Sequence, residues 1–383
     1  MVWPSQGAHN GHMSEMSSKI RLRWGTAIVA AVALIGGTIA VTTNAVADTP
    51  LPTLTAQELL TKVASAKVDG MSGTVEQTSN LGLPALPNLA GMGGGQDLSS
   101  ALALLTGTHT FRVWTSGTDK ARLALVDGTT ETDLIVNGTS VWMWSSADQK
   151  AVHRVLDADA KSSATPLPAN VPQTPAEMVK EILAKVGPTT DVTTSGTGTV
   201  AGRSVYQLVI TPKDAATLVR DVRVSVDSET FVPLAVSITG TSPDPAISVA
   251  FTDVSFAVPD ASLFSFTPPP GAKVTEATKD ATVPETKPVA ASERPKVVGE
   301  GWTTVVVAKL PTQTGDVTDG KTTDQTPASA GQIGMLLKSL PTVTGEWGTG
   351  HLLKTTLLNI IITTDGRVAV GSVELPVLYQ ALS

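Results

Sequence analysis

Apolar residues recur at helical spacing in several parts of the chain. The first of these stretches begins at Thr55, and Glu58 follows three residues later, which is the signature of a capping box at a helix N-terminus. Leu59, Leu60 and Val63 then follow at the spacing of one helix face. The same pattern predicts further helices over residues 96–105, 174–186, 328–340 and 376–382.

Alternation of apolar and polar residues replaces this pattern from His109 onward and predicts a series of strands. Asp127-Gly128 and Asn137-Gly138 favour type I′ turns, because both dipeptides accept two consecutive positive φ angles. A loop at Asn137-Gly138 places Val136 opposite Thr139. One face of this hairpin then carries Leu134, Val136, Val141 and Met143, and the other carries Ile135, Trp142 and Trp144. Both faces are partly apolar, so we expect both to be covered.

Strand patterns resume over residues 205–211, 221–227, 231–239 and 247–257. In the last of these, the apolar positions change parity, which predicts a β-bulge near Thr252-Asp253. Asp221 and Asp227 flank one strand without a partner acid, so we interpret them as solvated polar positions rather than as a glycosidase pair. Together the patterns predict an α+β fold with a long antiparallel sheet and helices segregated to one side.

Composition changes sharply over residues 268–297, which contain six Pro, nine charged residues and no aromatic residue. This predicts a flexible linker, because such a segment cannot bury enough apolar surface to fold. Residues 298–383 read as a second, small module. We expect its strands over 302–310, 352–363 and 367–373 and its closing helix over 376–382. The surface that this module contacts is left open between the first domain, a transporter and the membrane.

The N-terminal region has the features of an export signal. Basic residues within 19–23 precede residues 24–47, which carry no charge, and Ala45 and Ala47 fit an A-x-A cleavage site. An apolar stretch of this length is also enough to cross a bilayer, which needs about 20 residues. Residues 1–47 are therefore interpreted either as a leader with a signal peptide cleaved after Ala47 or as a retained transmembrane helix. In both cases the rest of the chain is extracytoplasmic, either secreted or anchored to the cytoplasmic membrane.

Composition excludes several classes of function. The 383-residue chain has 27 Lys and Arg against 34 Asp and Glu, and its net charge of −7 opposes nucleic-acid binding through a basic surface. It contains no Cys, which excludes a disulfide scaffold, a thiolate metal site, a Cys nucleophile and a lipid-modified N-terminal Cys.

No motif indicates catalysis. The segment from Gly345 to Gly350 has the glycine spacing of a phosphate loop, but His351 stands where Lys is required, so we predict a structural turn. His109, His153 and His351 do not have metal-ligand spacing, and there is no G-x-S-x-G motif. We therefore expect no catalytic residue, no metal and no cofactor, and we predict that the protein is not an enzyme.

The order of elements resembles the LolA family of bacterial lipoprotein carriers, whose fold is shared with LolB, with lipoprotein-binding regulators of the RseB type and with mycobacterial glycolipid carriers. The resemblance covers about residues 50–275. The LolA-like domain is expected over residues 48–267. It is carried by the opening helix followed by Gly73-Thr-Val-Glu-Gln-Thr78, by the 222–238 hairpin with Pro233-Leu234, and by Phe264-Ser-Phe-Thr-Pro-Pro-Pro-Gly271-Ala-Lys-Val274.

This resemblance implies a curved, half-open antiparallel sheet, an incomplete barrel closed by helices, whose apolar hollow takes acyl chains. The partners that it implies are lipid acyl chains or lipoproteins, the cytoplasmic membrane, and an ABC transporter or a membrane regulator. The function expected is that of an extracytoplasmic lipid or lipoprotein carrier of the bacterial envelope. The alternative is an RseB-like sensor of lipidated envelope proteins that controls a membrane partner.

Acyl chains require a large apolar concavity, and the chain offers two sets of side chains for it. One set lies in the leucine-rich and glycine-rich segment that we expect to form a mobile lid, and the other consists of tryptophans of the predicted sheet. The candidate ligand-binding residues are Leu81, Leu83, Leu86, Leu89, Met92, Leu98, Leu102, Trp114, Trp142 and Trp144. The alternative is that these side chains fill an ordinary core.

Overall fold

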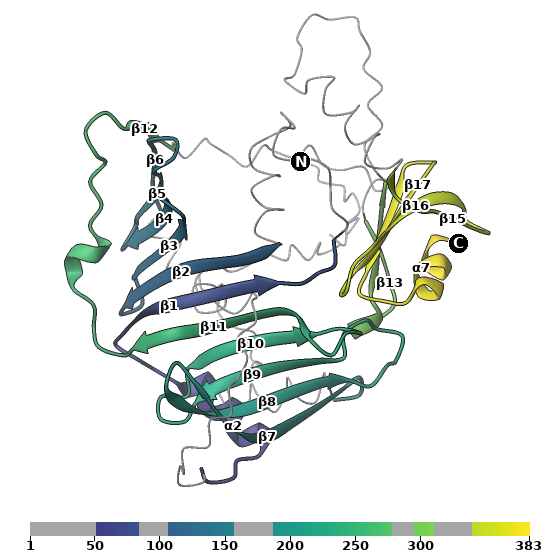
Figure 1. Ribbon diagram of the computed structural model, residues 1–383, viewed down its shortest axis with the longest axis horizontal. Coiled ribbons are helices and arrows are strands. Elements are labelled where there is room, and N and C mark those ends of the chain that lie inside the picture. The colour runs from purple at the N-terminus through teal and green to yellow at the C-terminus, as the bar shows by residue number, and fades with distance from the viewer. Residues whose placement is uncertain (1–50, 84–105, 157–186, 278–294, 310–338) are drawn as a thin grey trace, which may run out of the picture.

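The computed structural model describes residues 51–83, 106–156, 187–277, 295–309 and 339–383. These residues form two sheets, and the larger has twelve strands in the order β12-β6-β5-β4-β3-β2-β1-β11-β10-β9-β8-β7 (Figure 1). Its strands are β1 (Gly70–Ser79), β2 (Gly107–Ser116), β3 (Lys120–Asp127), β4 (Thr130–Asn137), β5 (Ser140–Ser145), β6 (Lys150–Val155), β7 (Thr190–Val200), β8 (Arg203–Pro212), β9 (Asp221–Asp227), β10 (Pro233–Thr239), β11 (Pro245–Ser255) and β12 (Lys273–Glu276).

The large sheet is open and strongly curved. Its edge strands, β12 and β7, do not pair with each other, so the sheet does not close into a barrel. In Figure 1 the strands β3, β4, β5, β6 and β12 rise one above another from β2 at the upper left, whereas β1 and the strands from β11 to β7 run across the lower half of the molecule. All pairs are antiparallel except β12 with β6. The predicted α+β fold with a half-open antiparallel sheet is confirmed.

Helix α2 (Ala56–Ser65) covers one end of this sheet. The predicted capping box is confirmed, because the Thr55 hydroxyl accepts from the Glu58 backbone N–H at 3.2 Å and the Glu58 carboxylate accepts from the Thr55 N–H at 2.8 Å. Leu59 is fully buried and packs against Tyr206, Leu208 and Val226 on strands β8 and β9. The apolar stripe of the helix thus forms one core of the sheet.

Both predicted hairpins are present, but their loops lie one residue later than expected. Strands β4 and β5 pair Asn137 with Ser140, so the loop is Gly138-Thr139, and Gly138 takes the left-handed φ of 62°. The predicted pairing of Val136 with Thr139 is therefore wrong, since Val136 lies opposite Val141. The β3–β4 hairpin is displaced in the same way. Pairing moves by two residues, which leaves every side chain on its predicted face.

Strand β11 contains the predicted bulge. Thr74 of β1 pairs with Asp253, but the next residue, Val75, pairs with Phe251, so Thr252 is the extra residue. Thr252 donates its hydroxyl to the Thr74 carbonyl at 3.2 Å. The nearby Gly73 leaves room for the Phe251 ring, because a Cβ at this glycine would lie only 2.8 Å from that ring. The bulge therefore seats a buried aromatic residue at the centre of the sheet.

The interpretation of Asp221 and Asp227 as solvated residues is wrong, because both carboxylates are buried. Asp227 accepts from the Arg203 guanidinium at 3.1 Å, from the Thr230 N–H at 2.7 Å and from the Thr230 hydroxyl at 2.8 Å. Burial raises the pKa of Asp227, but the hydrogen bonds from Arg203 and Thr230 outweigh it and leave the pKa below its usual 3.8. This carboxylate therefore links the β9–β10 turn, through Thr230, to strand β8, through Arg203.

The second sheet has six strands in the order β13-β14-β18-β17-β16-β15, with helix α7 (Leu375–Leu382) packed on it. Its strands are β13 (Lys296–Val298), β14 (Val305–Lys309), β15 (Thr342–Gly345), β16 (Gly348–Lys354), β17 (Asn359–Thr363) and β18 (Arg367–Gly371). The predicted closing helix and final strand are confirmed. The glycine-rich 345–350 segment is a hairpin turn, as predicted.

Two predictions for this second sheet are corrected. The single strand expected over 352–363 is two strands, because the Thr355 hydroxyl accepts from the Leu358 N–H at 2.8 Å and donates to the Leu358 carbonyl at 2.9 Å, which closes a turn. The strand expected to begin at Trp302 begins at Val305, after a 3₁₀ turn over Gly301–Thr303.

The second sheet docks on the ends of strands of the first. Thr217 forms an antiparallel bridge with Val373, and the Leu218 N–H donates to the Ser372 carbonyl at 2.9 Å. Leu81, Ala246 and Leu357 form a buried apolar cluster across the same interface. The contact surface of the C-terminal module, which the sequence left open, therefore includes the first sheet.

Some predictions fall outside the described residues. These are the signal peptide or anchor over residues 1–47, the helices over 96–105 and 174–186, and nearly all of the helix over 328–340. The segment expected to be a linker is described only at its two ends. There β12 lies within it and β13 begins within it, and β12 pairs with β6, so the range of 268–297 is too wide for a structureless linker.

We expect Asp227→Asn to lower the free energy of unfolding by about 2–4 kcal/mol, because it leaves Arg203 without its buried partner. Urea unfolding measures this loss. The folded-state pKa of Asp227 is lowered, so its contribution is present above the unfolded pKa of about 3.9 and is lost as pH falls through the folded pKa. The exposed Glu229, whose carboxylate also contacts Arg203, gives the control Glu229→Gln, with a loss below about 0.5 kcal/mol.

We also expect Leu357→Ala to lower the free energy of unfolding by about 2–3 kcal/mol, because it opens a cavity between the two sheets. The neighbouring Leu358 is 39% exposed, so Leu358→Ala is the matched control and costs below about 1 kcal/mol. Equal losses for the two variants, measured by urea unfolding, would show that the cluster of Leu81, Ala246 and Leu357 does not hold the sheets together.

Candidate functional site

A row of apolar side chains crosses four neighbouring strands of the large sheet. Leu123 of β3 pairs with Leu134 of β4, which pairs with Met143 of β5, which pairs with Val152 of β6. We call these four residues the open face. Leu134 is 40% exposed and Met143 is 55% exposed, whereas large apolar side chains of a sheet are usually covered.

The open face lies on the same side of the sheet as helix α2. Register relates the two, because Leu123 pairs with Val113, which pairs with Gly73, and the same side continues through Val249 and Val224 to Leu208 under the helix. Val113 and Leu208 are buried, so this side changes from core to exposed surface toward the β6 edge. The open face therefore continues a core and is left uncovered by the residues that the structure describes.

The opposite side of β3–β6 is covered by the chain that leads from β11 to β12. Its 3₁₀ turn, η3 (Ala261–Phe264), contacts β3 and β4, and Phe264 is only 1% exposed. Phe266 lies against two tryptophans of β5, with ring centroids 5.3 Å from Trp142 and 5.8 Å from Trp144. The Trp142 ring also stacks on His153 of β6 at 4.2 Å. This side is a packed aromatic layer.

An ion pair completes this covered side. The Arg122 Nε donates to the buried Asp133 carboxylate at 2.7 Å, and the Arg122 guanidinium lies 5.4 Å from the Trp114 ring centroid. Burial raises the pKa of Asp133, and Arg122 opposes that rise without cancelling it. Asp133 accepts this bond inside a packed layer and does not face the open side, so we assign it a structural role.

The structure places the described candidate residues in two groups, away from the open face. Leu81 and Leu83 lie at the interface with the second sheet, in the cluster with Leu357. Trp114, Trp142 and Trp144 share the covered side of β2–β5. Leu86, Leu89, Met92, Leu98 and Leu102 lie outside the described residues. None of the described five contributes to the open face.

Sequence reasoning placed Leu134 and Met143 on one face of a hairpin but did not choose them as site residues. The larger tryptophans on the other face were predicted as ligand-binding residues instead. The signal that distinguishes the two faces is the Phe264–Phe266 segment, which is apolar and lies far along the chain, and its position on the sheet is visible only in three dimensions. Leu123 and Val152 were missed because their strand partners depend on register.

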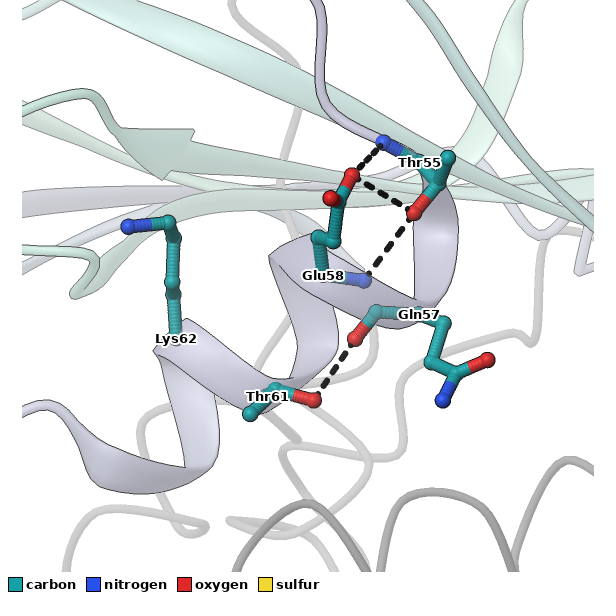
Figure 2. A pocket seen from close by; sticks show the side chains of 5 residues that line it. All are labelled: Thr55, Gln57, Glu58, Thr61 and Lys62. Carbon is teal, nitrogen blue, oxygen red and sulfur yellow. Dashed lines mark hydrogen bonds between the residues drawn. The ribbon is translucent and has the colours of Figure 1, made fainter.

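A hollow lies at the start of α2, lined by Thr55, Gln57, Glu58, Thr61 and Lys62 (Figure 2). Thr55 and Glu58 form the capping box, the Thr61 hydroxyl donates to the Gln57 carbonyl at 2.8 Å, and the Lys62 ammonium lies 4.6 Å from the Phe231 ring centroid. The hydrogen bonds from Thr55 hold the pKa of Glu58 below 4.5. These contacts account for the hollow as a helix cap.

The chemistry available at the open face is that of binding. Its four side chains carry no titratable group, so they can bury an apolar chain but cannot transfer a proton. Among the described residues, no group of three or more His, Asp or Glu side chains is arranged to hold a metal ion. In the same part of the chain, no helix has the length and apolar character needed to cross a membrane.

We expect Met143→Ala to change the free energy of unfolding by less than about 1 kcal/mol, because the Met143 side chain is largely exposed. Ile135 is 2% exposed on the covered side of the neighbouring strand, and Ile135→Ala should cost about 2–5 kcal/mol. Urea unfolding of the two variants compares the two sides of the sheet. A large loss for Met143→Ala would show that the open face is part of the core.

No protein family model matches the chain, and no curated protein matches it. Solved structures are similar in fold. The complex of MucA and MucB from Pseudomonas aeruginosa matches with 14% identity over 85% of this chain and 96% of that chain, with a TM-score of 0.41. A LolA superfamily protein from Nitrosomonas europaea matches with 12% identity over 56% of this chain and 99% of that chain, with a TM-score of 0.22. These similarities concern the fold alone and assign no function.

Proposed function

We propose that this protein is a non-catalytic binding protein for the acyl chains of free lipids or of lipoproteins. The bound acyl chain lies across the open face. The observation that supports this is the apolar row of Leu123, Leu134, Met143 and Val152, which continues a buried core yet leaves Leu134 and Met143 exposed. An acyl chain completes the core that the sheet leaves open.

The energetics of such binding are favourable. Each methylene group that leaves water for an apolar surface contributes about 0.8 kcal/mol. Four side chains across four strands offer a track about 15 Å long at a strand spacing of about 4.8 Å, which matches roughly a dozen methylenes. Met143 suits this role because its unbranched, polarizable side chain adapts to a flexible ligand.

The export signal over residues 24–47 supports an extracytoplasmic location, where lipids and lipoproteins of the envelope are handled. Whether cleaved or retained, this segment delivers the binding domain to the outer side of the cytoplasmic membrane. We further propose that leucines of the segment after Leu83, among them Leu86 and Leu89, contact the ligand. An ABC transporter or a membrane regulator as recipient belongs to the same proposal.

We expect Met143→Asp to weaken binding of a fluorescent sixteen-carbon fatty acid at least tenfold, because the carboxylate would have to be desolvated beneath the chain. Val155→Asp is the matched control. Val155 is 56% exposed near the edge of the same sheet but on its opposite side, so the control should bind as the unchanged protein does. Fluorescence titration of full-length protein measures both dissociation constants.

Mass spectrometry of the native protein from its host complements this titration. Copurified lipid that is lost in Met143→Asp but kept in Val155→Asp supports lipid carriage. A protein that copurifies with one lipidated membrane protein instead, again through Met143, supports the sensor of lipidated proteins. Equal binding by both variants would contradict a ligand site on the open face.

A further inference from the structure

The edge of the sheet beside the open face carries positive charge. Lys150 and Arg154 flank Val152 on β6 at positions that point to the same side as Val152, and Lys273 of β12 pairs with Lys150. All three side chains are exposed. We call Lys150, Arg154 and Lys273 the basic rim.

The three side chains of the basic rim form no ion pair with a described carboxylate. Of the seven described arginines, Arg122, Arg203, Arg220, Arg223 and Arg367 each form an ion pair with a carboxylate, whereas Arg112 and Arg154 do not. Lys150 and Lys273 likewise form no ion pair with a described carboxylate, as is true of every described lysine except Lys213. On the open side of β4–β6, the described residues include no Asp or Glu.

These three cations lie together on one side of the sheet, although the chain as a whole is acidic, with a net charge of −7. The acidic side chains of β4 and β12 project to the other side, where Glu131 and Asp133 bind Arg122 and Glu276 contacts His153 at 2.8 Å. Two like charges on directly paired strand positions, as in Lys150 and Lys273, repel each other unless an anion lies near them. On the other side of the sheet, carboxylates of the chain contact Arg122 and His153. No described carboxylate does the same for the basic rim.

We propose that the ligand of the open face is an anionic lipid with a phosphate headgroup, whose acyl chain lies on Leu134 and Met143 and whose phosphate lies at the basic rim. This rests on the proposed acyl-chain function and adds the class of ligand to it. The distances are suitable, because Lys150 and Arg154 are each two residues from Val152, about 7 Å along the strand. A guanidinium and two ammonium groups match the charge and the acceptor geometry of a phosphate.

The test compares two ligands with the same ten-carbon chain, decyl phosphate and decanol, both below their aggregation limits. Full-length protein in detergent-free buffer should bind decyl phosphate at least tenfold more tightly at low salt, and salt should reduce that preference by screening. Lys150→Gln combined with Arg154→Gln should remove the preference and leave decanol binding unchanged. Arg112→Gln is the control, because Arg112 is also exposed and unpaired but lies on the opposite side.

The outcomes separate this inference from the proposed function. Decanol binding that depends on Met143, without any preference for decyl phosphate, overturns the phosphate site but retains the acyl-chain function. Absence of binding to either ligand overturns both. A preference that survives in the double variant, or that Arg112→Gln reduces equally, also overturns the assignment of the rim. Rim-dependent sedimentation with phosphatidylglycerol vesicles but not with phosphatidylcholine vesicles, without decyl phosphate binding, would indicate membrane docking instead and overturn the proposal.

Discussion

The alternation of side chains across one continuous sheet is the constraint on which the rest of this structure depends. Twelve paired strands assign each residue to one of two sides, and each side must be covered or left exposed as a whole region. On β3–β6 both sides are apolar, but the described residues cover only the side that carries Trp142 and Trp144. The exposure of Leu134 and Met143 follows from that one-sided packing.

Local patterns in the sequence were sufficient wherever structure depends on neighbouring residues. The capping box of Thr55 and Glu58, the bulge at Thr252 and the strand from Asp221 to Asp227 were all predicted. The β4–β5 register was displaced by two residues, yet Leu134 and Met143 were still assigned to one face. The reason is that the side-chain period of a strand is two, so an even displacement preserves the faces.

Features that depend on contacts between distant residues were not predictable in this way. Asp227 looks like a surface residue until Arg203 and Thr230 are placed around it. The run of apolar residues after Leu352 looks like one strand until the Thr355 turn divides it. The tryptophan Trp142 was expected to line the ligand site, but Phe266 packs on it. The sequence alone does not place the segment of Phe266 on β5. Residue type identified the apolar faces of the strands. Tertiary packing determines which of these faces is exposed to solvent.

An exposed apolar row near a sheet edge is normally a hazard, since two copies of a chain can pair through it. The basic rim counters that hazard, because Lys150, Arg154 and Lys273 would face the same charges on a second copy. Repulsion of this kind acts on another copy of the chain but not on an anionic amphiphile. The same three cations therefore oppose self-association and favour a lipid with a negative headgroup. One arrangement of charge beside the open face thus serves both the exposure of that surface and the ligand class that we propose for it.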